Sequence, residues 1–327
     1  MNEQYLKLRK SVFNYDERKF LISKIAESLQ EADLTLPANC DGFGRIHHFI
    51  RNADTDWIPD PLPIDPASKA LNIMYSDQIL TQVFQLALCN LNCWYCFVPN
   101  ILKAANDNYS KWFSCDELVE LILKNNQSPH VIDLSGGNPE LVPEWLIEMM
   151  KSLEKHSLTK DYYLWSDDAL STDLFFEVLS PSEIDYVKNY KNYGKVCCFK
   201  GFDKYSCNFN TGKSLDFFDE QINRFSKYHN LNIDLYGYVT LTDETYEDID
   251  NRISSFFDAL QKIHPYLPLR TIPLKIKMFS PLQGAIYNKY ATSISNQSFA
   301  IEAWKNQLNK RFTSAELSCN ITEINLN

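Results

Sequence analysis

From residue 79 onward, short apolar runs alternate with segments of helical periodicity, and this alternation restricts the fold more than any other feature. The runs with strand character are 79–88, 130–137, 162–166, 195–201, 231–242 and 269–279. The segments with helical character are 115–125, 143–156, 172–180, 182–190, 215–229, 246–264 and 297–310. Such alternation predicts an α/β fold whose parallel strands are joined by right-handed crossovers. Six repeats fit either a doubly wound sheet or an incomplete barrel.

The chain before residue 79 has a different character. Leu21, Ile22, Ile25 and Leu29 are spaced to share one helical face, so a helix is predicted there. Five prolines between residues 36 and 70 exclude a long helix, and this stretch is expected to wrap over the surface. Further along, Ser114 and Glu117 have the spacing of a capping box, which predicts the start of the helix over 115–125.

Composition and charge narrow the class of protein. The nine cysteines are an odd number in a chain whose N-terminal segment lacks the apolar core of a secretory signal, so we expect reduced thiols and a cytoplasmic location. Without a run of 18 apolar residues, no membrane span is expected. The formal net charge of −10 argues against a nucleic-acid partner, since such proteins usually carry a basic face.

Three of the cysteines lie within eight residues, directly after the first strand-like run. Cys89, Cys93 and Cys96 are spaced by four and by three residues, so one short loop can present all three thiolates to a metal centre. A [4Fe–4S] cluster bound by three cysteines leaves one iron free for another ligand. Zinc sites more often use paired Cys-x2-Cys units, and no second pair exists here. Buried structural thiols are the simplest alternative.

This cysteine loop resembles the signature of the radical S-adenosylmethionine (SAM) superfamily, with Tyr95 in its aromatic position. The resemblance implies a partial (β/α)6 TIM-type barrel, a [4Fe–4S] cluster on Cys89, Cys93 and Cys96, and Tyr95 packed beside it. It further implies that the free iron binds SAM. One electron, supplied by a flavodoxin or a ferredoxin, then cleaves SAM to methionine and a 5′-deoxyadenosyl radical that abstracts hydrogen from the substrate.

Other positions match the family less completely. Gly136 and Gly137 resemble the start of a Gly-Gly-Glu-Pro segment whose backbone pairs with the SAM amino group. Asn138 stands where Glu is usual, and the resemblance implies that it keeps the backbone role at the SAM site. Ser166 or Asp167, after the third strand, would contact the SAM ribose, or would cap the next helix. The resemblance of Lys200 to the lysine of glycyl-radical activating enzymes implies a contact with the SAM carboxylate, but a surface position is equally compatible.

Several polar clusters carry weaker hypotheses. Lys275 and Lys277 share one face of the last strand-like run, directed either to a barrel lumen or to water. Adjacent His47 and His48 would point to opposite sides of a strand, which argues against one shared metal ion. A second cluster is not expected. The cysteines considered for it are Cys197, Cys198 and Cys207, with Cys40, Cys115 or Cys319.

The predicted organisation has three parts: a helix and wrapping segment (1–78), a radical SAM core barrel (79–282) and a C-terminal helical extension (283–327). The predicted function is a radical SAM enzyme, with a small molecule or nucleotide favoured as substrate. The alternatives are an enzyme that activates or modifies a protein or peptide, and a non-catalytic iron–sulfur or zinc sensor.

Overall fold

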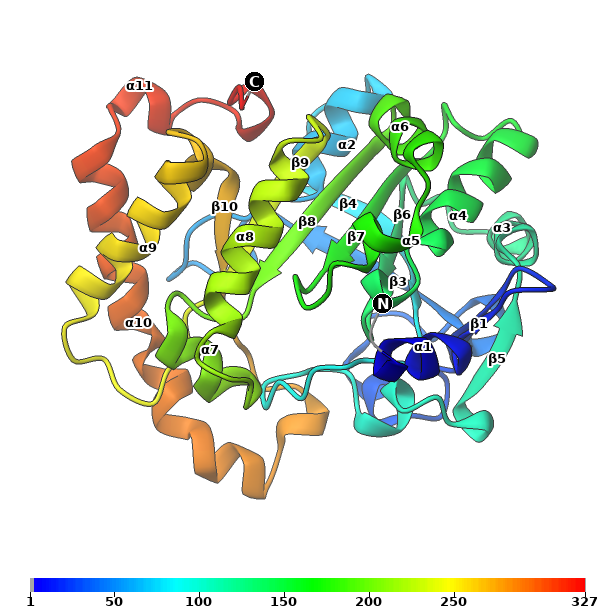
Figure 1. Ribbon diagram of the computed structural model, residues 1–327, viewed down its shortest axis with the longest axis horizontal. Helices are drawn as coiled ribbons and strands as arrows, with labels where there is room; N and C mark the ends of the chain where they lie inside the picture. Colours follow the sequence, from blue (N-terminus) through cyan, green and yellow to red (C-terminus); the bar gives the residue numbers. More distant parts are fainter. Residues whose placement is uncertain (1–2, 327) are drawn as a thin grey trace.

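The computed structural model describes residues 3–326 and contains a curled seven-stranded sheet, the partial TIM-type barrel that the resemblance implies. Its strand order is β10-β9-β8-β7-β6-β4-β3 (Figure 1). Six strands run parallel: β4 (Gln78–Gln85), β6 (Val131–Ser135), β7 (Tyr163–Asp168), β8 (Tyr193–Phe199), β9 (Asp234–Thr240) and β10 (Thr271–Leu274). The seventh, β3 (Gly44–Ile50), pairs antiparallel with β4 at one edge. β3 lies in the stretch that we expected only to wrap over the surface, so an antiparallel edge strand joins the predicted parallel strands.

Helices follow the strands in the predicted order. They are α3 (Cys115–Lys124), α4 (Glu144–Lys155), α5 (Leu174–Val178), α6 (Pro181–Asn189), α7 (Lys204–Thr211), α8 (Phe217–His229), α9 (Ile249–Ile263), α10 (Ala285–Arg311) and α11 (Ser314–Leu317). Helix α3 begins at the predicted capping box, where Ser114 Oγ accepts from Glu117 N and the Glu117 carboxylate accepts from Ser114 N. Helix α10 begins twelve residues before the predicted start at 297, and α7 has no counterpart among the predicted elements.

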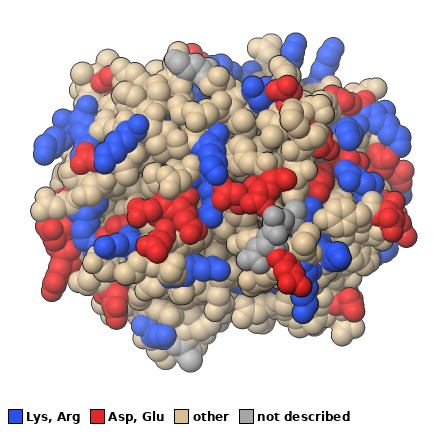
Figure 2. Space-filling view, viewed as in Figure 1, with Lys and Arg blue, Asp and Glu red and all other residues tan. Residues whose placement is uncertain are grey.

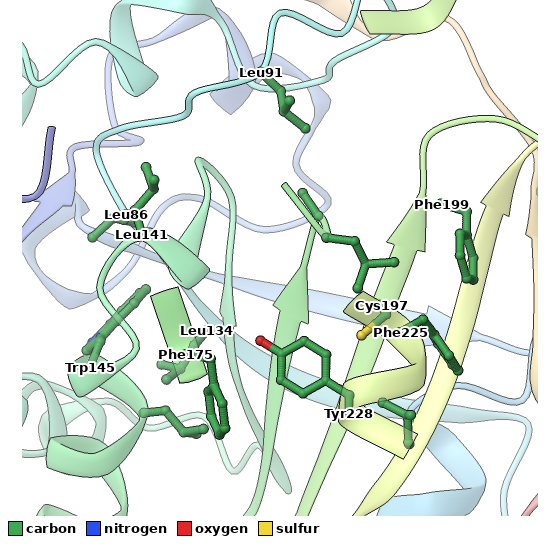
Figure 3. Packing of buried hydrophobic residues seen from close by; sticks show 14 of the residues in the cluster. Leu86, Leu91, Leu134, Leu141, Trp145, Phe175, Cys197, Phe199, Phe225 and Tyr228 are labelled. Carbon is green, nitrogen blue, oxygen red and sulfur yellow. The ribbon is translucent and has the colours of Figure 1, made fainter. Parts of the chain in front are cut away.

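The main hydrophobic core lies between the sheet and its covering helices. Alternate strand residues such as Leu134 and Phe199 pack there against helix residues such as Trp145 and Phe225 (Figure 3). Leu86, from the loop after β4, joins the same cluster (Figure 3). The loop that carries the three cysteines is therefore anchored in the core at its start.

A second cluster fills the opposite face of the sheet, inside the curl. Its strand members include Val131, Trp165 and Tyr236, which alternate with residues of the main core. Ile64 and Ala67 of α2 (Ile64–Leu71) pack into it and are fully buried. Most of its strand residues stand near the N-terminal ends of their strands, so α2 and its neighbours close that end of the lumen.

The N-terminal region forms a small second sheet. Its strands are β1 (Phe13–Asn14), β2 (Lys19–Ser23) and β5 (Ser110–Phe113), in the order β1-β2-β5. The predicted helix through Leu21 and Ile22 is wrong, because β2 pairs with β5 and is buried on both faces. An apolar strand buried on both faces has no alternation, so a helical spacing can arise there by coincidence. Helix α1 (Glu3–Lys10) precedes this sheet, and its buried Arg9 pairs with Glu144 at 2.5 Å.

The segment between β3 and β4 does wrap as expected. Its Trp57 Nε1 donates to the Pro273 carbonyl at 2.8 Å, and Arg51 pairs with Asp65 of α2. Asp60 accepts hydrogen bonds from Leu62 N at 3.0 Å and from Tyr238 OH at 2.9 Å. These contacts tie the segment to the inner side of β9 and to the far edge of the sheet.

Surface charges are mixed on the face seen in Figure 2, where Lys and Arg side chains lie scattered among Asp and Glu. On this face, no continuous basic stripe of the kind typical of nucleic-acid binding runs across the described residues. Among residues 3–326, no helix is both long and apolar enough to cross a membrane.

The half-buried position of Asp60 leads to a prediction about the pH dependence of stability. Burial raises the pKa of Asp60 to about 6, so the folded state holds a proton that the unfolded state releases near pH 4. Stability from this group is therefore lost as pH rises from about 4 to 6. We expect Asp60→Asn to gain, relative to the wild type, on the order of 2 kcal/mol of unfolding free energy between pH 4 and pH 7.5. Urea titrations at both pH values measure this difference, and parallel pH profiles for the two proteins would contradict it.

Candidate active site

The three cysteines lie in the loop that joins β4 to the 3-10 turn Asn100–Lys103, beyond the C-terminal ends of the strands (Figure 1). The loop is closed at its base, because Cys89 N donates to the Lys103 carbonyl at 3.1 Å. Within it, Cys96 N donates to the Cys93 carbonyl at 3.2 Å, which folds the last two cysteines into a tight turn. The barrel thus presents the predicted motif at the end where barrel enzymes bind their ligands.

The tip of the loop is held by the C-terminal part of the chain. Trp94 N and Nε1 donate to the main-chain and side-chain oxygens of Asn210, at 3.2 and 3.0 Å. The Trp94 ring stacks on Tyr290 of α10 with 4.2 Å between ring centroids. Tyr95, the next residue, accepts a hydrogen bond from Thr240 Oγ1 at 3.0 Å. Elements far apart in sequence therefore fix the turn between Cys93 and Cys96.

Neighbouring thiols act on the ionisation of Cys89 and Cys93. Burial, together with Cys93 and Cys96, raises the pKa of Cys89 to about 12, and burial and Cys96 raise that of Cys93. Two cations oppose this effect: Lys103 acts on both thiols, and Lys200 acts on Cys93. Across residues 3–326, no three Cys, His, Asp or Glu side chains converge on a position for one metal ion. The loop therefore offers three neighbouring thiols without forming a single-ion zinc site.

This donor set fits a [4Fe–4S] cluster. The cluster takes thiolates on separate irons, so its ligands do not need to surround one point. Cys89 and Cys93, whose pKa values burial and the neighbouring thiols raise, would be stabilised as thiolates by the cationic irons of the cluster. The two nearby lysines add positive charge around the resulting anionic centre.

Gly136 and Gly137, directly after β6, pack against the start of the cysteine loop. Both have positive φ, +59° and +56°. A Cβ on Gly137 would lie 2.5 Å from the Leu88 carbonyl oxygen and would overlap that of Leu86. Asn138 N, next in sequence, donates to the Leu88 carbonyl at 2.7 Å. Only glycine allows this approach of the two backbones, so the Gly-Gly turn and the cysteine loop form one unit.

The Asn138 side chain serves that same unit. It is buried, and its Nδ2 donates to Asn90 of the cysteine loop at 2.5 Å, to Ser171 at 2.9 Å and to Glu140 at 3.0 Å. Burial and Asp168 raise the pKa of Glu140 well above its usual range, so this carboxyl is held neutral. Asn138, the residue that stands where the family usually has glutamate, therefore uses its amide nitrogen for hydrogen bonds within the protein.

Ser166 and Asp167 lie on opposite faces of β7. Ser166 Oγ points to the helix side and bonds Tyr193 OH at 2.9 Å. Asp167 faces the lumen, where Ser135 Oγ donates to it at 2.5 Å. Lys200, just after β8, reaches the same region: burial alone would lower its pKa, but Cys198, Tyr95 and Cys93 raise it well above the usual value. The structure therefore groups Asp167 and Lys200 with the cysteine loop and separates Ser166 from it.

The weaker candidates lie elsewhere. Lys275 and Lys277 follow β10 and pair with Asp56 and Asp54, each at 2.6 Å, so neither lysine depends on a ligand for its counter-charge. Cys197 is buried on the helix side of the sheet, in the main core. The histidines of β3 lie opposite Thr81 and Leu80 of β4, on opposite faces as predicted.

Three buried charged residues lie near the site, and the sequence did not predict them as part of it. Lys103 ends the 3-10 turn after the cysteine loop, Asp133 sits inside an apolar strand, and Arg45 belongs to β3, in the stretch that was expected to wrap over the surface. The one available signal was a charge within the apolar run 130–137, since buried charges are costly without a partner or a function.

A family model supplies the decisive comparison. The Radical SAM superfamily model matches residues 86–255, just over half of the chain, a range that includes the cysteine loop, the Gly136–Gly137 turn, Asp167 and Lys200. The chain belongs to the radical SAM superfamily. Members of this superfamily bind a [4Fe–4S] cluster and SAM, so this radical SAM protein is an enzyme with those two cofactors.

Solved structures resemble this radical SAM enzyme only distantly. "Native anSMEcpe with bound AdoMet" is 18% identical, with a TM-score of 0.41, over 67% of this chain and 60% of that one. SuiB of Streptococcus suis bound to S-adenosylmethionine is 14% identical, with a TM-score of 0.37, over 53% and 36%. TYW1 with a lysine-pyruvate adduct bound is 12% identical, with a TM-score of 0.39, over 79% and 78%. The chain thus spans less than two thirds of anSMEcpe and SuiB. No curated protein matches it.

The contact between the glycine turn and the cysteine loop can be tested with two glycines of similar backbone conformation. Gly137→Ala forces a methyl group into the Leu86 and Leu88 carbonyls, so we expect a loss of at least about 3 kcal/mol of unfolding free energy. Gly212→Ala is the control, because Gly212 also has positive φ (+69°) but no atom lies within 4 Å of its added Cβ. There we expect a loss of about 1 kcal/mol. Equal losses in denaturant titrations would contradict the close packing.

Proposed function

We propose that Cys89, Cys93 and Cys96 hold the [4Fe–4S] cluster and that the enzyme cleaves SAM reductively to act on a small-molecule substrate. The observation that carries the proposal is the joining of the three-thiol loop to the Gly136–Gly137 turn, at the C-terminal ends of the strands. When bound, the cluster and SAM supply a 5′-deoxyadenosyl radical that removes a hydrogen atom from the substrate.

The roles of the chain's other residues follow from their positions. The Gly136–Gly137 backbone is free of side chains and offers its polar groups to the SAM amino group. Lys200 supplies a positive charge for the SAM carboxylate, and Asp167 supplies acceptor oxygens for the ribose hydroxyls. Tyr95 packs beside the cluster, fixed by Thr240. Asn138 is a positioning residue, since its amide nitrogen holds the cysteine loop through Asn90.

The closed end of the lumen favours a small molecule or nucleotide over a peptide. Leu62, Ile64 and Ala67 are fully buried against the inner faces of the strands. An extended peptide would need an open groove, whereas a small molecule can be enclosed from the other end. In this proposal residues 79–282 form the catalytic core, 1–78 and 283–327 enclose it, and a flavodoxin or ferredoxin delivers the electron.

A cysteine substitution tests the cluster assignment. We expect Cys93→Ala, after anaerobic reconstitution and reduction with dithionite in the presence of SAM, to form no 5′-deoxyadenosine above the protein-free background. Cys115→Ala is the matched control, because Cys115 is a buried thiol at the start of α3, outside the three-cysteine loop. It should keep the iron content and SAM cleavage of the wild type. Normal cleavage by Cys93→Ala, or none by the wild type, would refute the proposed function and favour a structural or sensory role for the thiols.

A second substitution tests the SAM site. We expect Lys200→Met to weaken SAM binding about tenfold, as measured by equilibrium dialysis with the reconstituted protein, because the carboxylate loses a partly desolvated charge partner. Lys204→Met, four residues on, removes an exposed lysine and should change the dissociation constant less than about twofold. Equal affinities for the two variants would exclude the proposed contact with Lys200.

A further inference from the structure

Arg45 of β3 places a cation in the lumen. It is 8% exposed, and its Nε makes no hydrogen bond within residues 3–326. In the part of the chain that the structure describes, no acid lies within ion-pair distance of its guanidinium. The guanidinium carbon lies over the Phe97 ring, 5.7 Å from the ring centroid. Burial lowers the pKa of Arg45 despite the opposing effect of Asp133 and Asp167. The fold therefore holds a charge in a place where it receives little compensation.

An acid faces the same space from β6. Asp133 is 3% exposed, and its Oδ1 has no hydrogen-bond partner among the described residues. Burial and Asp167 raise the pKa of Asp133 well above its usual range, while Arg45 acts in the opposite direction. Ile132 and Leu134 on either side pack into the main core, so the Asp133 side chain points the other way, into the lumen.

The register of the sheet places these two residues in one row. Arg45 is opposite Val83 in β4, and Val83 is the partner of Asp133 in β6. The small valine leaves the long arginine side chain and the carboxylate facing each other across it. The buried Oγ1 of Thr81, on the same face of β4 one row deeper, also lacks a partner.

This row is close to the proposed radical chemistry. Phe97, over which Arg45 lies, directly follows Cys96. Asp133 lies two residues before Ser135, which donates to Asp167 at the proposed ribose site. A ligand held by Arg45 and Asp133 would therefore sit deeper in the lumen than SAM and beside it.

A buried guanidinium without an ion-pair partner and a buried carboxyl with an unbonded oxygen are costly in a finished core but suit a site that a ligand completes. We propose that Arg45 and Asp133 bind the substrate, and that the substrate is a free amino acid or a small molecule with the same pair of groups. Arg45 takes the carboxylate through its guanidinium, and Asp133 takes the ammonium group, which restores its ionised form.

Charge balance favours this class over an organic phosphate. The row offers one guanidinium and one carboxyl, and Asp167 adds a second acid nearby. A dianionic phosphate offers no cationic group to Asp133 or Asp167, whereas a zwitterion gives Arg45 a carboxylate and Asp133 an ammonium group. The amino and carboxylate groups of SAM have other partners in the proposed function, namely the Gly136–Gly137 turn and Lys200, on which this inference rests.

Thermal stability measured with defined probes tests the proposal. The reconstituted protein with SAM is heated alone and with millimolar concentrations of each standard L-α-amino acid, acetate, methylamine or tri-alanine. We expect at least one amino acid to raise the midpoint of the wild type, while acetate and methylamine, which carry only one of the two groups, do not. Arg45→Met and Asp133→Asn should each weaken that effect at least tenfold in dissociation constant.

Two further readouts separate this site from the fold and from the SAM site. Arg45→Met should unfold, without any probe, at or above the wild-type midpoint, because it removes an uncompensated buried charge. Both variants should bind SAM within about twofold of the wild type. Loss of SAM binding by the wild type would refute the proposed function. The substrate site is refuted if SAM binds but no amino acid stabilises the protein, if Arg45→Met retains the effect, or if tri-alanine alone produces it.

Discussion

The turn after β6 and the loop after β4 are in direct backbone contact. This contact determines the geometry of the rest of the site. Gly137 approaches the Leu86 and Leu88 carbonyls so closely that no side chain fits between them, and Asn138 closes the contact with a main-chain hydrogen bond. This interaction fixes where the three thiols stand relative to the ends of the parallel strands. The roles proposed for Lys200, Asp167 and Tyr95 depend on that fixed position.

Much of the fold could be predicted because its elements carry local signals. The capping box at Ser114 predicts a helix start from four residues, and the strands and helices after residue 79 are predictable from their own hydrophobic patterns. The errors occur where tertiary pairing decides the structure. Leu21 and Ile22 become a strand because β5 lies beside them, and β3 forms because β4 offers an open edge.

The site was predictable to a similar extent and for similar reasons. The cysteine spacing and the paired glycines are local patterns, whereas the facing of Arg45, Asp133 and Asp167 depends on strand register. Ser166 and Asp167 show the difference clearly: they are adjacent in sequence, yet the pleat of β7 sends one to the helices and the other to the lumen. The replacement of the usual glutamate by Asn138 also becomes understandable only when Asn90, Glu140 and Ser171 surround it.

The sealing of one end of the lumen by α2 has a kinetic consequence. Ile64 and Ala67 close the N-terminal ends of the strands. Substrate and SAM would therefore enter the lumen from the opposite end, where the cysteine loop lies. A molecule seated on Arg45 and Asp133 would lie below the nucleoside and be covered by it. Binding would then be ordered: the deeper ligand enters before SAM, and the products leave in the reverse order.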